Sequence, residues 1–565
     1  MNELNKLVAE IYGKSVAKDI CRKIEDIVKI YAKRKHFIKK TPSLSEKDVV
    51  LICYADNIRY KNEPSLKVMD NFFNEFLGDR ISYIHFLPFF PYSSDDGFAI
   101  TNFRTVNPKY GSWKDIRKIS RKYGLIFDAV INHISSKHKW FQNYLKFDKK
   151  YEDYFIKMDK NADVSKVTRA RDLPLLNKFQ KGGKDVFVWT TFSDDQIDLN
   201  FHSPKVLLEV IDLLLFYASK GASIIRLDAI AYIWKKANSN CINLKEVHKI
   251  IMIIRRIFDM VFPHIMLLPE ANVPSKENLK YLGNGYNEAQ LLYQFCISPL
   301  VLYTFYSGNV DHLHNYLDTV PELPGDNYFL NVLATHDGIG LRPVHDILDP
   351  DEIKLIINEI EKRNGIISYK TEQNGKKSPY ELNITYFDAL RDNDCVEKQN
   401  IAKFVAAQAI LLSIKGLPAL YFHNLFGTKN YYEGYENTNQ PRTLNRRKFE
   451  LNELENLLNN KESSEAIIFK KINKLLSIRK KYFAFHPNAK QEIVNISDHI
   501  FSIIRKGKED NYKMLILVNV TDQKCNCKIP QTILSNDSID IIAKRKIIPE
   551  IEFTMYPYEI LWIPF

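Results

Sequence analysis

The sequence of 565 residues lacks several features that would each indicate a particular class of protein. Its seven cysteines are odd in number and irregularly spaced, which disfavours a disulfide framework or a zinc module. No apolar run reaches the roughly 20 residues that span a bilayer. The N-terminal MNELNKLVAEIYGK lacks the basic and apolar segments of a secretory signal. We therefore expect a cytoplasmic protein without a membrane partner.

Long tracts of one charge are also missing. Eighty Lys and Arg against 68 Asp and Glu give a net charge of +12, which by itself suits a polyanionic partner. The basic residues form short clusters such as Lys33–Lys35 and Arg479–Lys481, which is typical of a solvated surface. Nucleic-acid binding would need basic residues gathered beside stacking aromatics, so we do not expect it. The charged fraction of 26% and hydrophobic fraction of 45% exclude disorder across most of the chain.

A recurring unit organises most of the chain: a short apolar run rich in β-branched residues, polar residues, then an amphipathic helical stretch. This order predicts parallel strands joined by helices. In one such helix Ser203 is a candidate N-cap, Pro204 fits the first turn, and Gly221 follows the end. Eight units predict the α/β class and a (β/α)8 TIM barrel. The predicted strands cover residues 48–57, 81–90, 125–133, 222–230, 264–271, 288–295, 329–337 and 416–423.

Further segments surround this barrel. Residues 1–47 read as an N-terminal helical segment. The barrel itself is assigned to residues 48–138 and 196–460, with loop insertions at 139–195, after the third strand, and at 338–400. A helix near 462–481 precedes a change of pattern, and a C-terminal antiparallel β domain is predicted over 490–565. Its predicted strands are 499–506, 512–520, 539–543 and 550–563.

Residues that can do chemistry gather where the predicted strands end, and the loops of such a barrel converge there. The fourth strand ends in Arg226 and Asp228, which are two residues apart and so share a face. The fifth ends in Glu270, and the seventh in His336 and Asp337. One such residue alone is usually a cap or a satisfied polar group. Together, on successive strands, they indicate a catalytic pocket.

Four motifs lie in order along the chain: DAVINH ending at His133, RLDAIAYIW with Asp228, PEAN with Glu270, and ATHD ending at Asp337. On these motifs the sequence resembles the α-amylase superfamily, glycoside hydrolase family 13, over most of its length. The segments LPFFPYSSDDGFAI, DLNFHSPKV, NEAQLLYQF and SPYELNITYFDAL resemble its sucrose phosphorylase branch. SSDDGF, SYKTEQNG and SPYELN are most similar to glucosylglycerate phosphorylases, whereas sucrose phosphorylases usually have Gln in place of Glu381.

Retaining glycosyl transfer needs one ionised carboxylate that attacks the anomeric carbon and one protonated carboxyl that assists the leaving oxygen. We assign Asp228 as the nucleophile and expect Arg226 to favour its charged form by lowering its pKa. Glu270 is the acid/base, because the family places it there and because catalysis needs a second carboxyl in a different environment. By resemblance, Asp337 is the third carboxylate, which holds sugar hydroxyls and favours the oxocarbenium-like transition state.

The resemblance also implies contacts to the glucosyl unit. His133 and His336 would donate hydrogen bonds to it. Candidate sugar platforms near the motifs are Phe98, Tyr232 and Trp234.

Asp95 resembles the acid that binds the far end of the sugar ring, with Arg446 as its ion-pair partner. The neighbours Arg442 and Arg447 could take the place of Arg446.

The acceptor separates a hydrolase from a phosphorylase, and the residues alone leave both open. The resemblance implies that inorganic phosphate resolves a β-glucosyl enzyme into α-D-glucose 1-phosphate. Lys370 and Tyr380 are proposed acceptor contacts in the 338–400 insertion, together with Glu381. The implied substrate is 2-O-α-D-glucosylglycerate, and glucosylglycerol, sucrose and sucrose 6-phosphate are alternatives. A noncatalytic sugar-binding barrel should have lost a catalytic carboxylate or Arg226, and this chain has not.

The resemblance implies neither a metal nor another cofactor. Asn132 matches a calcium-ligand position of amylases, but the phosphorylase branch resembles a metal-free site. The expected partners are a small α-glucoside and phosphate. The sequence does not give the oligomeric state, and a homodimer stays open.

Overall fold

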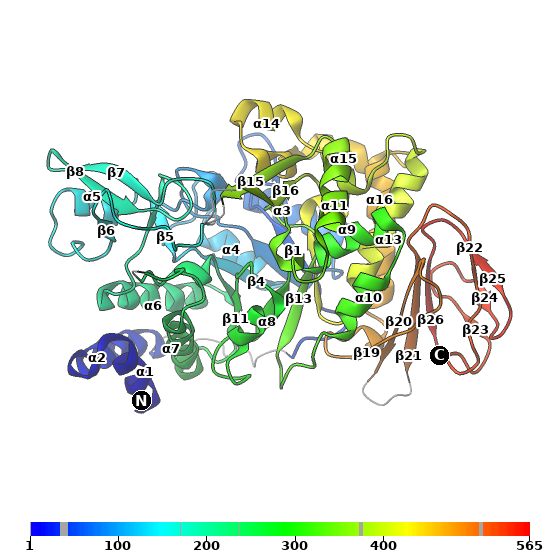
Figure 1. Cartoon of the computed structure of the whole chain (residues 1–565), viewed down its shortest axis with the longest axis horizontal. Coiled ribbons are helices and arrows are strands. Elements are labelled where there is room, and N and C mark those ends of the chain that lie inside the picture. Colours follow the sequence, from blue (N-terminus) through cyan, green and yellow to red (C-terminus); the bar gives the residue numbers. More distant parts are fainter. Residues whose placement is uncertain (1, 34–42, 170, 237, 372–376, 508–511) are drawn as a thin grey trace.

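Eight parallel strands form the centre of the computed structural model, which describes residues 2–33, 43–169, 171–236, 238–371, 377–507 and 512–565 (Figure 1). Their spatial order is β11-β10-β4-β3-β1-β17-β13-β12, and each overlaps one predicted range, so the (β/α)8 prediction is confirmed. They are β1 (Val50–Cys53), β3 (Tyr83–Phe86), β4 (Gly124–Ala129), β10 (Ala222–Leu227), β11 (Met266–Pro269), β12 (Leu291–Gln294), β13 (Tyr328–Val332) and β17 (Leu417–Tyr421).

Gln290 joins the two strands at the ends of this order, β11 and β12. Its backbone N–H donates to the carbonyl of Leu267 at 3.2 Å, and its side-chain oxygen accepts the N–H of Leu267 at 3.1 Å. The strands read as continuous apolar runs because side chains fill one face of a barrel sheet and helices cover the other.

Helices return the chain between these strands. α6 (Pro204–Ser219) begins after Ser203 as predicted, but the Ser203 hydroxyl donates to Asp153 at 2.9 Å instead of capping the helix. Gly221 follows its end with φ +108°, a conformation that a side chain would strain. Other helices around the barrel are α3 (Ser65–Phe72), α4 (Trp113–Ile119), α7 (Lys245–Val261), α8 (Ser275–Asn278), α9 (Ile297–Ser307), α10 (Asp311–Asp318), α13 (Glu397–Ser413) and α16 (Ser464–Arg479).

The two long segments predicted as insertions carry small sheets of their own (Figure 1). The first contains α5 (Lys139–Leu145) and an antiparallel sheet of β6 (Lys157–Met158), β7 (Leu176–Lys181) and β8 (Lys184–Trp189), and the two-stranded pair of β5 (His133–Ser135) and β9 (Gln196–Asp198) flanks it. The second contains α11 (Pro350–Lys362), α12 (Tyr386–Leu390) and the sheet of β14 (Ile339–Gly340), β15 (Ile366–Thr371) and β16 (Lys377–Asn383). Residues 372–375 of the SYKTEQNG motif lie outside the described residues.

The C-terminal region is antiparallel, as predicted. Its main sheet contains β19 (Lys490–Ile493), β20 (Ile500–Lys506), β21 (Lys513–Asn519) and β26 (Ile560–Pro564). The single strand predicted over 550–563 is wrong, because a turn with Tyr558 at φ +56° separates β25 (Phe553–Met555) from β26. Of the strand predicted over 539–543, only Ile539 belongs to one, β23 (Ser538–Ile539). The remaining strands are β22 (Cys525–Cys527) and β24 (Lys546–Ile547).

Two buried arginines fasten this sheet to the barrel. Arg479 of α16 donates to the carbonyls of Leu412 at 3.1 Å and Phe485 at 2.9 Å. Arg505 of β20 donates to the carbonyl of Ser413, at the end of α13, at 2.7 Å. Backbone carbonyls accept the hydrogen bonds of these buried guanidinium groups. The contact between the C-terminal region and the barrel therefore contains directional hydrogen bonds in addition to apolar packing.

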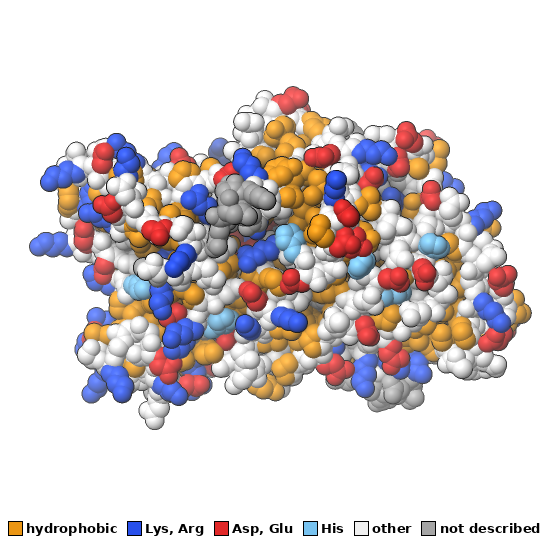
Figure 2. Space-filling view, viewed as in Figure 1, with side chains coloured by type: hydrophobic (Ala, Val, Ile, Leu, Met, Phe, Trp, Pro, Cys, Tyr) orange, Lys and Arg blue, Asp and Glu red, His pale blue; other side chains and the backbone are white. Residues whose placement is uncertain are grey.

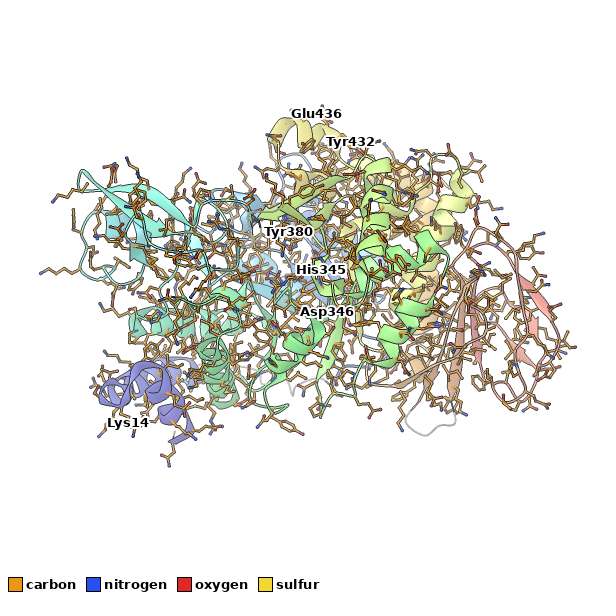
Figure 3. The ribbon with its side chains drawn as sticks, viewed as in Figure 1. Lys14, His345, Asp346, Tyr380, Tyr432 and Glu436 are labelled. Carbon is orange, nitrogen blue, oxygen red and sulfur yellow. The ribbon has the colours of Figure 1, made fainter. Side chains whose placement is uncertain are left out.

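The N-terminal helices α1 (Asn2–Tyr12) and α2 (Lys14–Ala32) pack on α7 and α6. Figure 3 shows Lys14 on α2 at one end of the molecule and Tyr380 of β16 in its middle. On the face drawn in Figure 2, acidic and basic side chains are intermingled. No helix in the part of the chain that the structure describes is long and apolar enough to cross a membrane.

Candidate active site

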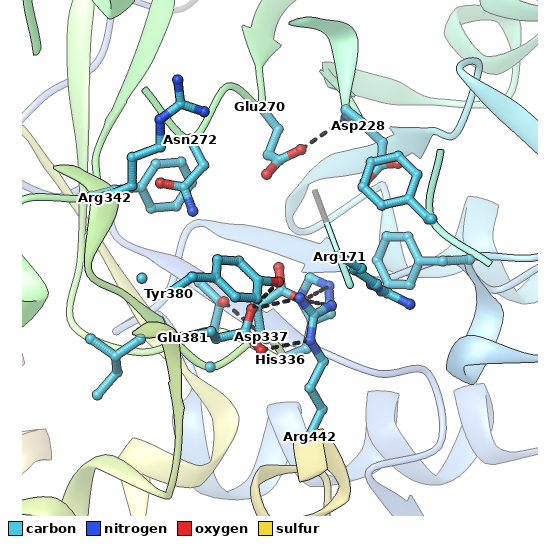
Figure 4. A pocket seen from close by; sticks show the side chains of 18 of the residues that line it. Arg171, Asp228, Glu270, Asn272, His336, Asp337, Arg342, Tyr380, Glu381 and Arg442 are labelled. Carbon is cyan, nitrogen blue, oxygen red and sulfur yellow. Dashed lines mark hydrogen bonds and ion pairs between the residues drawn. The ribbon is translucent and has the colours of Figure 1, made fainter. Parts of the chain in front are cut away.

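A pocket opens where the barrel strands end (Figure 4), and the predicted site residues line it, the candidate platform Tyr232 included, except Arg446 and the candidate platform Trp234. The second inserted sheet forms part of its wall and contributes Lys370 from β15 and Tyr380 and Glu381 from β16. The predicted residues in the lining are Asp95, Phe98, His133, Arg226, Asp228, Glu270, His336, Asp337, Lys370, Tyr380 and Glu381. Their roles in binding and catalysis stay predictions.

The guanidinium of Arg226, at the end of β10, ties three carboxylates together. One of its nitrogens, Nη1, lies 2.8 Å from Oδ1 of Asp228 and also contacts Asp128, its register partner on β4. Its Nη2 lies 3.9 Å from Oε2 of Glu270. Asp128 in turn accepts a hydrogen bond from His85 at 2.8 Å. Burial raises the pKa of Asp128, but Arg226 and His85 outweigh it and lower that pKa to about 2.

Arg226 lowers the pKa of Asp228, as predicted, but the net shift is upward, which was not predicted. Burial raises the pKa of Asp228 well above its ordinary value, and the neighbouring Glu270 and Asp128 raise it further. Arg226 does lower it, but its charge is shared with Asp128 and does not outweigh the loss of solvent.

Asp228 and Glu270 therefore titrate as a pair. Burial is also the largest cause that raises the pKa of Glu270. Two buried carboxyls of this kind hold one proton between them over a wide pH range. Arg226 lies 2.8 Å from Asp228 and 3.9 Å from Glu270, so of these two carboxyls Asp228 is the one whose charged form the guanidinium stabilises more. The backbone N–H of Ala229 donates to Oε2 of Glu270 at 2.8 Å.

Arg442 binds Asp337, the carboxylate at the end of the ATHD motif. It forms an ion pair with Asp337 and a two-point contact with Glu381, from Nε at 2.9 Å and Nη2 at 2.7 Å. Burial raises the pKa of Asp337, but Arg442 outweighs it with help from His336, and the net shift is downward. The sequence offered Arg442 only as an alternative to Arg446, because an arginine in a single short helical turn gives no periodic signal.

Tyr380 and Glu381 form one hydrogen-bonded unit. The Tyr380 hydroxyl donates to Oε2 of Glu381 at 3.1 Å. Glu381 is 5% exposed, and a Cβ at Gly338 would lie 2.5 Å from its Cγ. The glycine that follows Asp337 therefore makes room for this carboxylate beside the pocket.

The predicted ion pair between Asp95 and Arg446 is present, but Asp95 has nearer neighbours that were not predicted. Arg171 lies 3.0 Å from it, whereas the predicted partner Arg446 lies 3.5 Å from it and 2.8 Å from Asp96. Gln196 also donates to Asp95, at 3.3 Å. Burial raises the pKa of Asp95, but Arg171 and Arg446 outweigh it and lower that pKa below its usual range.

The two histidines are buried and bonded within the protein. Nε2 of His133 lies 3.0 Å from the carbonyl of Phe98, and the Phe98 ring stacks on His336 with centroids 4.7 Å apart. Burial lowers the pKa of His133 to about 4 and of His336 to about 3, so both are neutral at pH 7. Of the candidate platforms, Trp234 is outside the lining and packs on His202, with ring centroids 4.0 Å apart.

A buried lysine occupies the surroundings of Asn132. Nζ of Lys235 lies 2.8 Å from Oδ1 of Asn132 and 2.5 Å from Oδ2 of Asp198. An internal cation thus already neutralises the oxygens that a divalent ion would need, and these residues do not fit calcium. Within the described ranges, no three His, Cys, Asp or Glu side chains are grouped as metal ligands.

The chain resembles known proteins over nearly all of its length. The family model "Alpha amylase, catalytic domain" matches residues 79–337. A glucosylglycerate phosphorylase of Allomeiothermus silvanus is 43% identical over 85% of this chain and 86% of its own length. A glucosylglycerate phosphorylase of Spirochaeta thermophila is 37% identical over 100% of this chain and 98% of its own length.

Among solved structures, a sucrose 6F-phosphate phosphorylase from Thermoanaerobacter thermosaccharolyticum shares the fold. It matches with a TM-score of 0.75 and 24% identity, and covers 91% of this chain and 99% of that one.

The fold and the pocket define a barrel enzyme of the glycoside-processing class, with paired carboxylates at the strand ends. The chain belongs to the α-amylase family, glycoside hydrolase family 13, together with the glucosylglycerate phosphorylases.

The lowered histidine pKa values predict a loss of stability in mild acid. The folded values of about 4 for His133 and about 3 for His336 lie below the unfolded value of about 6.5. Below pH 6.5 the unfolded chain therefore binds more protons than the folded chain, and the free energy of unfolding decreases as the pH is lowered. We expect each histidine to remove about 2 kcal/mol of the free energy of unfolding between pH 7 and pH 5.

Urea unfolding at the two pH values measures this effect. The His336→Gln variant, which cannot titrate there, should lose about 2 kcal/mol less than the wild type between pH 7 and pH 5. An identical loss in both proteins would show that His336 does not titrate as described.

Proposed function

We propose that the chain is a retaining glycoside phosphorylase that converts 2-O-α-D-glucosylglycerate and inorganic phosphate into α-D-glucose 1-phosphate and glycerate. The observation that carries the proposal is the match of 37% and 43% identity, over most or all of the chain, to proteins named glucosylglycerate phosphorylase. The pocket supports it, because a buried carboxyl pair with one shared proton is what retaining transfer requires.

In the first step a carboxylate oxygen of Asp228 attacks the anomeric carbon of the glucosyl unit. The bond from that carbon to the glycerate oxygen breaks, and Glu270 gives its proton to the departing oxygen. Asp228 loses its charge to the ester while Glu270 gains one. Arg226 contacts both carboxyls, so the site keeps one negative charge beside the same guanidinium throughout.

In the second step an oxygen of phosphate attacks the anomeric carbon from the side that glycerate has left. Glu270 takes the proton of the attacking hydrogen phosphate, and the electron pair of the ester bond returns to Asp228. Two inversions give net retention and α-D-glucose 1-phosphate.

Asp337 and Asp95 are suited to hold the glucosyl unit. Both are half-buried beside arginines that keep them ionised, Arg442 at Asp337 and Arg171 at Asp95. Ionised carboxylates accept strong hydrogen bonds from sugar hydroxyls. An ionised Asp337 near the anomeric centre also favours the positive charge that develops there in the transition state.

The cytoplasm is the proposed compartment. All seven cysteines are unpaired, and four of them, Cys53, Cys241, Cys296 and Cys527, are at most 3% exposed. Free thiols in this number suit a reducing environment. A homodimer stays a proposal that gel filtration with light scattering can test.

A substrate panel tests the reaction. Purified protein is incubated with 2-O-α-D-glucosylglycerate, glucosylglycerol, sucrose or sucrose 6-phosphate, with and without phosphate, and glucose 1-phosphate and glucose are quantified. We expect phosphate-dependent glucose 1-phosphate, formed fastest from glucosylglycerate. Glucose release that ignores phosphate would show a hydrolase, and binding of the glucosides without turnover would show a sugar-binding protein.

Variants of the carboxyl pair test the assigned roles. Asp228→Ala should lower turnover by at least about 1,000-fold, because no other group can form the ester. Glu270→Gln should lower turnover of glucosylglycerate by about 100- to 10,000-fold. On α-D-glucosyl fluoride the Glu270→Gln loss should be smaller, since fluoride leaves without a proton.

The exposed Asp522 of the C-terminal region offers a control. Asp522→Ala should keep wild-type turnover, and circular dichroism should show all three variants folded. Substantial turnover by folded Asp228→Ala, or an equal Glu270→Gln loss on both donors, would contradict the assignments.

A further inference from the structure

The site leaves one side of the pocket for the acceptor. Under the proposed function, on which this inference rests, the glycerate oxygen leaves toward Glu270 and phosphate later arrives along the same path. The acceptor therefore lies beside Glu270 and away from the sugar-binding corner at Asp95. Both acceptors are anions, so a cation is required on that side.

Most guanidinium groups of the pocket are already neutralised. Arg226 contacts Asp228 and Asp128, Arg171 contacts Asp95, and Arg442 contacts Asp337. The two lining arginines that form no ion pair with any carboxylate in the described ranges are Arg169 and Arg342.

Arg342 is held on a rigid segment. It follows β14, whose Ile339 and Gly340 pair with Leu382 and Glu381 of β16. The N–H of Leu341 then donates to the carbonyl of Tyr380 at 3.0 Å, and the Leu341 side chain is fully buried. The backbone on both sides of Arg342 is thus fixed between the inserted sheet and the barrel, which gives its side chain a defined origin.

Its neighbours place Arg342 next to the acid/base. Burial raises the pKa of the Tyr232 hydroxyl, whereas Arg342 lowers it by donating a hydrogen bond to it and Glu270 raises it. Tyr232 therefore lies within reach of both groups. Figure 4 shows Arg342 and Asn272 together on one side of Glu270, with Asp228 on the other.

Asn272 completes this wall. It follows Glu270 by two residues and packs against Gly340, where a Cβ would lie 2.9 Å from its Nδ2. Its Oδ1 accepts no hydrogen bond from any residue that the structure describes. The guanidinium of Arg342 can bind a carboxylate, and Oδ1 of Asn272 can accept a hydrogen bond from a hydroxyl. Together they complement a small hydroxy acid.

We propose that Arg342 determines acceptor specificity by binding the carboxylate of glycerate, with Asn272 accepting a hydrogen bond from a glycerate hydroxyl. A guanidinium presents two parallel donors that match a carboxylate and equally match two oxygens of phosphate. Arg342 thus favours both anions over a neutral polyol or water. Glu381, whose charge is already bound to Arg442, does not repel them.

Transfer from α-D-glucosyl fluoride separates acceptor recognition from donor recognition, because this donor carries no anion. Initial rates of transfer to glycerate and to glycerol are measured for the wild type, Arg342→Met and Arg342→Lys. The ratio of kcat/KM for glycerate over glycerol should fall about 10- to 100-fold in Arg342→Met, as expected for one charge-assisted contact. Arg342→Lys, which keeps the charge without the paired donors, should give an intermediate ratio.

Arg169→Met is the matched control, since it removes the other unpaired guanidinium of the lining, and its ratio should stay within about threefold of the wild type. An unchanged ratio in Arg342→Met, or an equal fall with both acceptors, overturns the inference while leaving the proposed function standing. A wild-type protein that prefers glycerol overturns both.

Discussion

A charged guanidinium inside a protein needs charged or polar groups that replace its lost solvation, and at the centre of this molecule carboxylates fill that role. Arg226 is 3% exposed, at the carboxyl end of β10. The parallel register brings Asp128 beside it, and the two-residue spacing on the strand brings Asp228. With Glu270 from the next strand, one cation faces more carboxyls than it can neutralise. The pKa values of both Asp228 and Glu270 are therefore raised, and the reaction that we propose needs one of these carboxyls protonated beside the other in its ionised form.

Outside this centre, the pocket is divided by the loops that follow the strands. Arg171, from a loop, and Arg442, from the 3-10 helix Pro441–Asn445, keep Asp95 and Asp337 ionised on the side that we propose for the sugar. The inserted sheet carries Tyr380 and Glu381, and Glu381 is taken up by Arg442 instead of facing a ligand alone. The barrel therefore supplies the chemistry common to the family. We propose that the insertions determine the charge of the acceptor side.

The sequence predicted the barrel well because its strands are buried on both faces and read as separated apolar runs. The same periodicity placed Asp228 and Glu270 at one rim. The loop contacts could not be predicted, since Arg446 lies nearer Asp96 than Asp95 and nothing in a linear pattern gives that distance. The upward net shift in the pKa of Asp228 was not predicted, for a related reason. The two-residue spacing reveals one cation, whereas the burial and the competing Asp128 become visible only in three dimensions. The strand predicted over 550–563 failed at Tyr558, which adopts a positive φ that its residue type does not signal.

The central claim is that Arg226 holds Asp228 as the group that becomes covalently bonded to the sugar. Incubation with 5-fluoro-α-D-glucosyl fluoride, which forms the ester faster than it is resolved, followed by peptide mass mapping, tests this directly. We expect one fluoroglucosyl group per chain, on Asp228 in the peptide containing Ile225-Arg226-Leu227-Asp228, and its loss when phosphate is added. A label on another carboxylate, or turnover with no label under conditions that accumulate the ester, would contradict it.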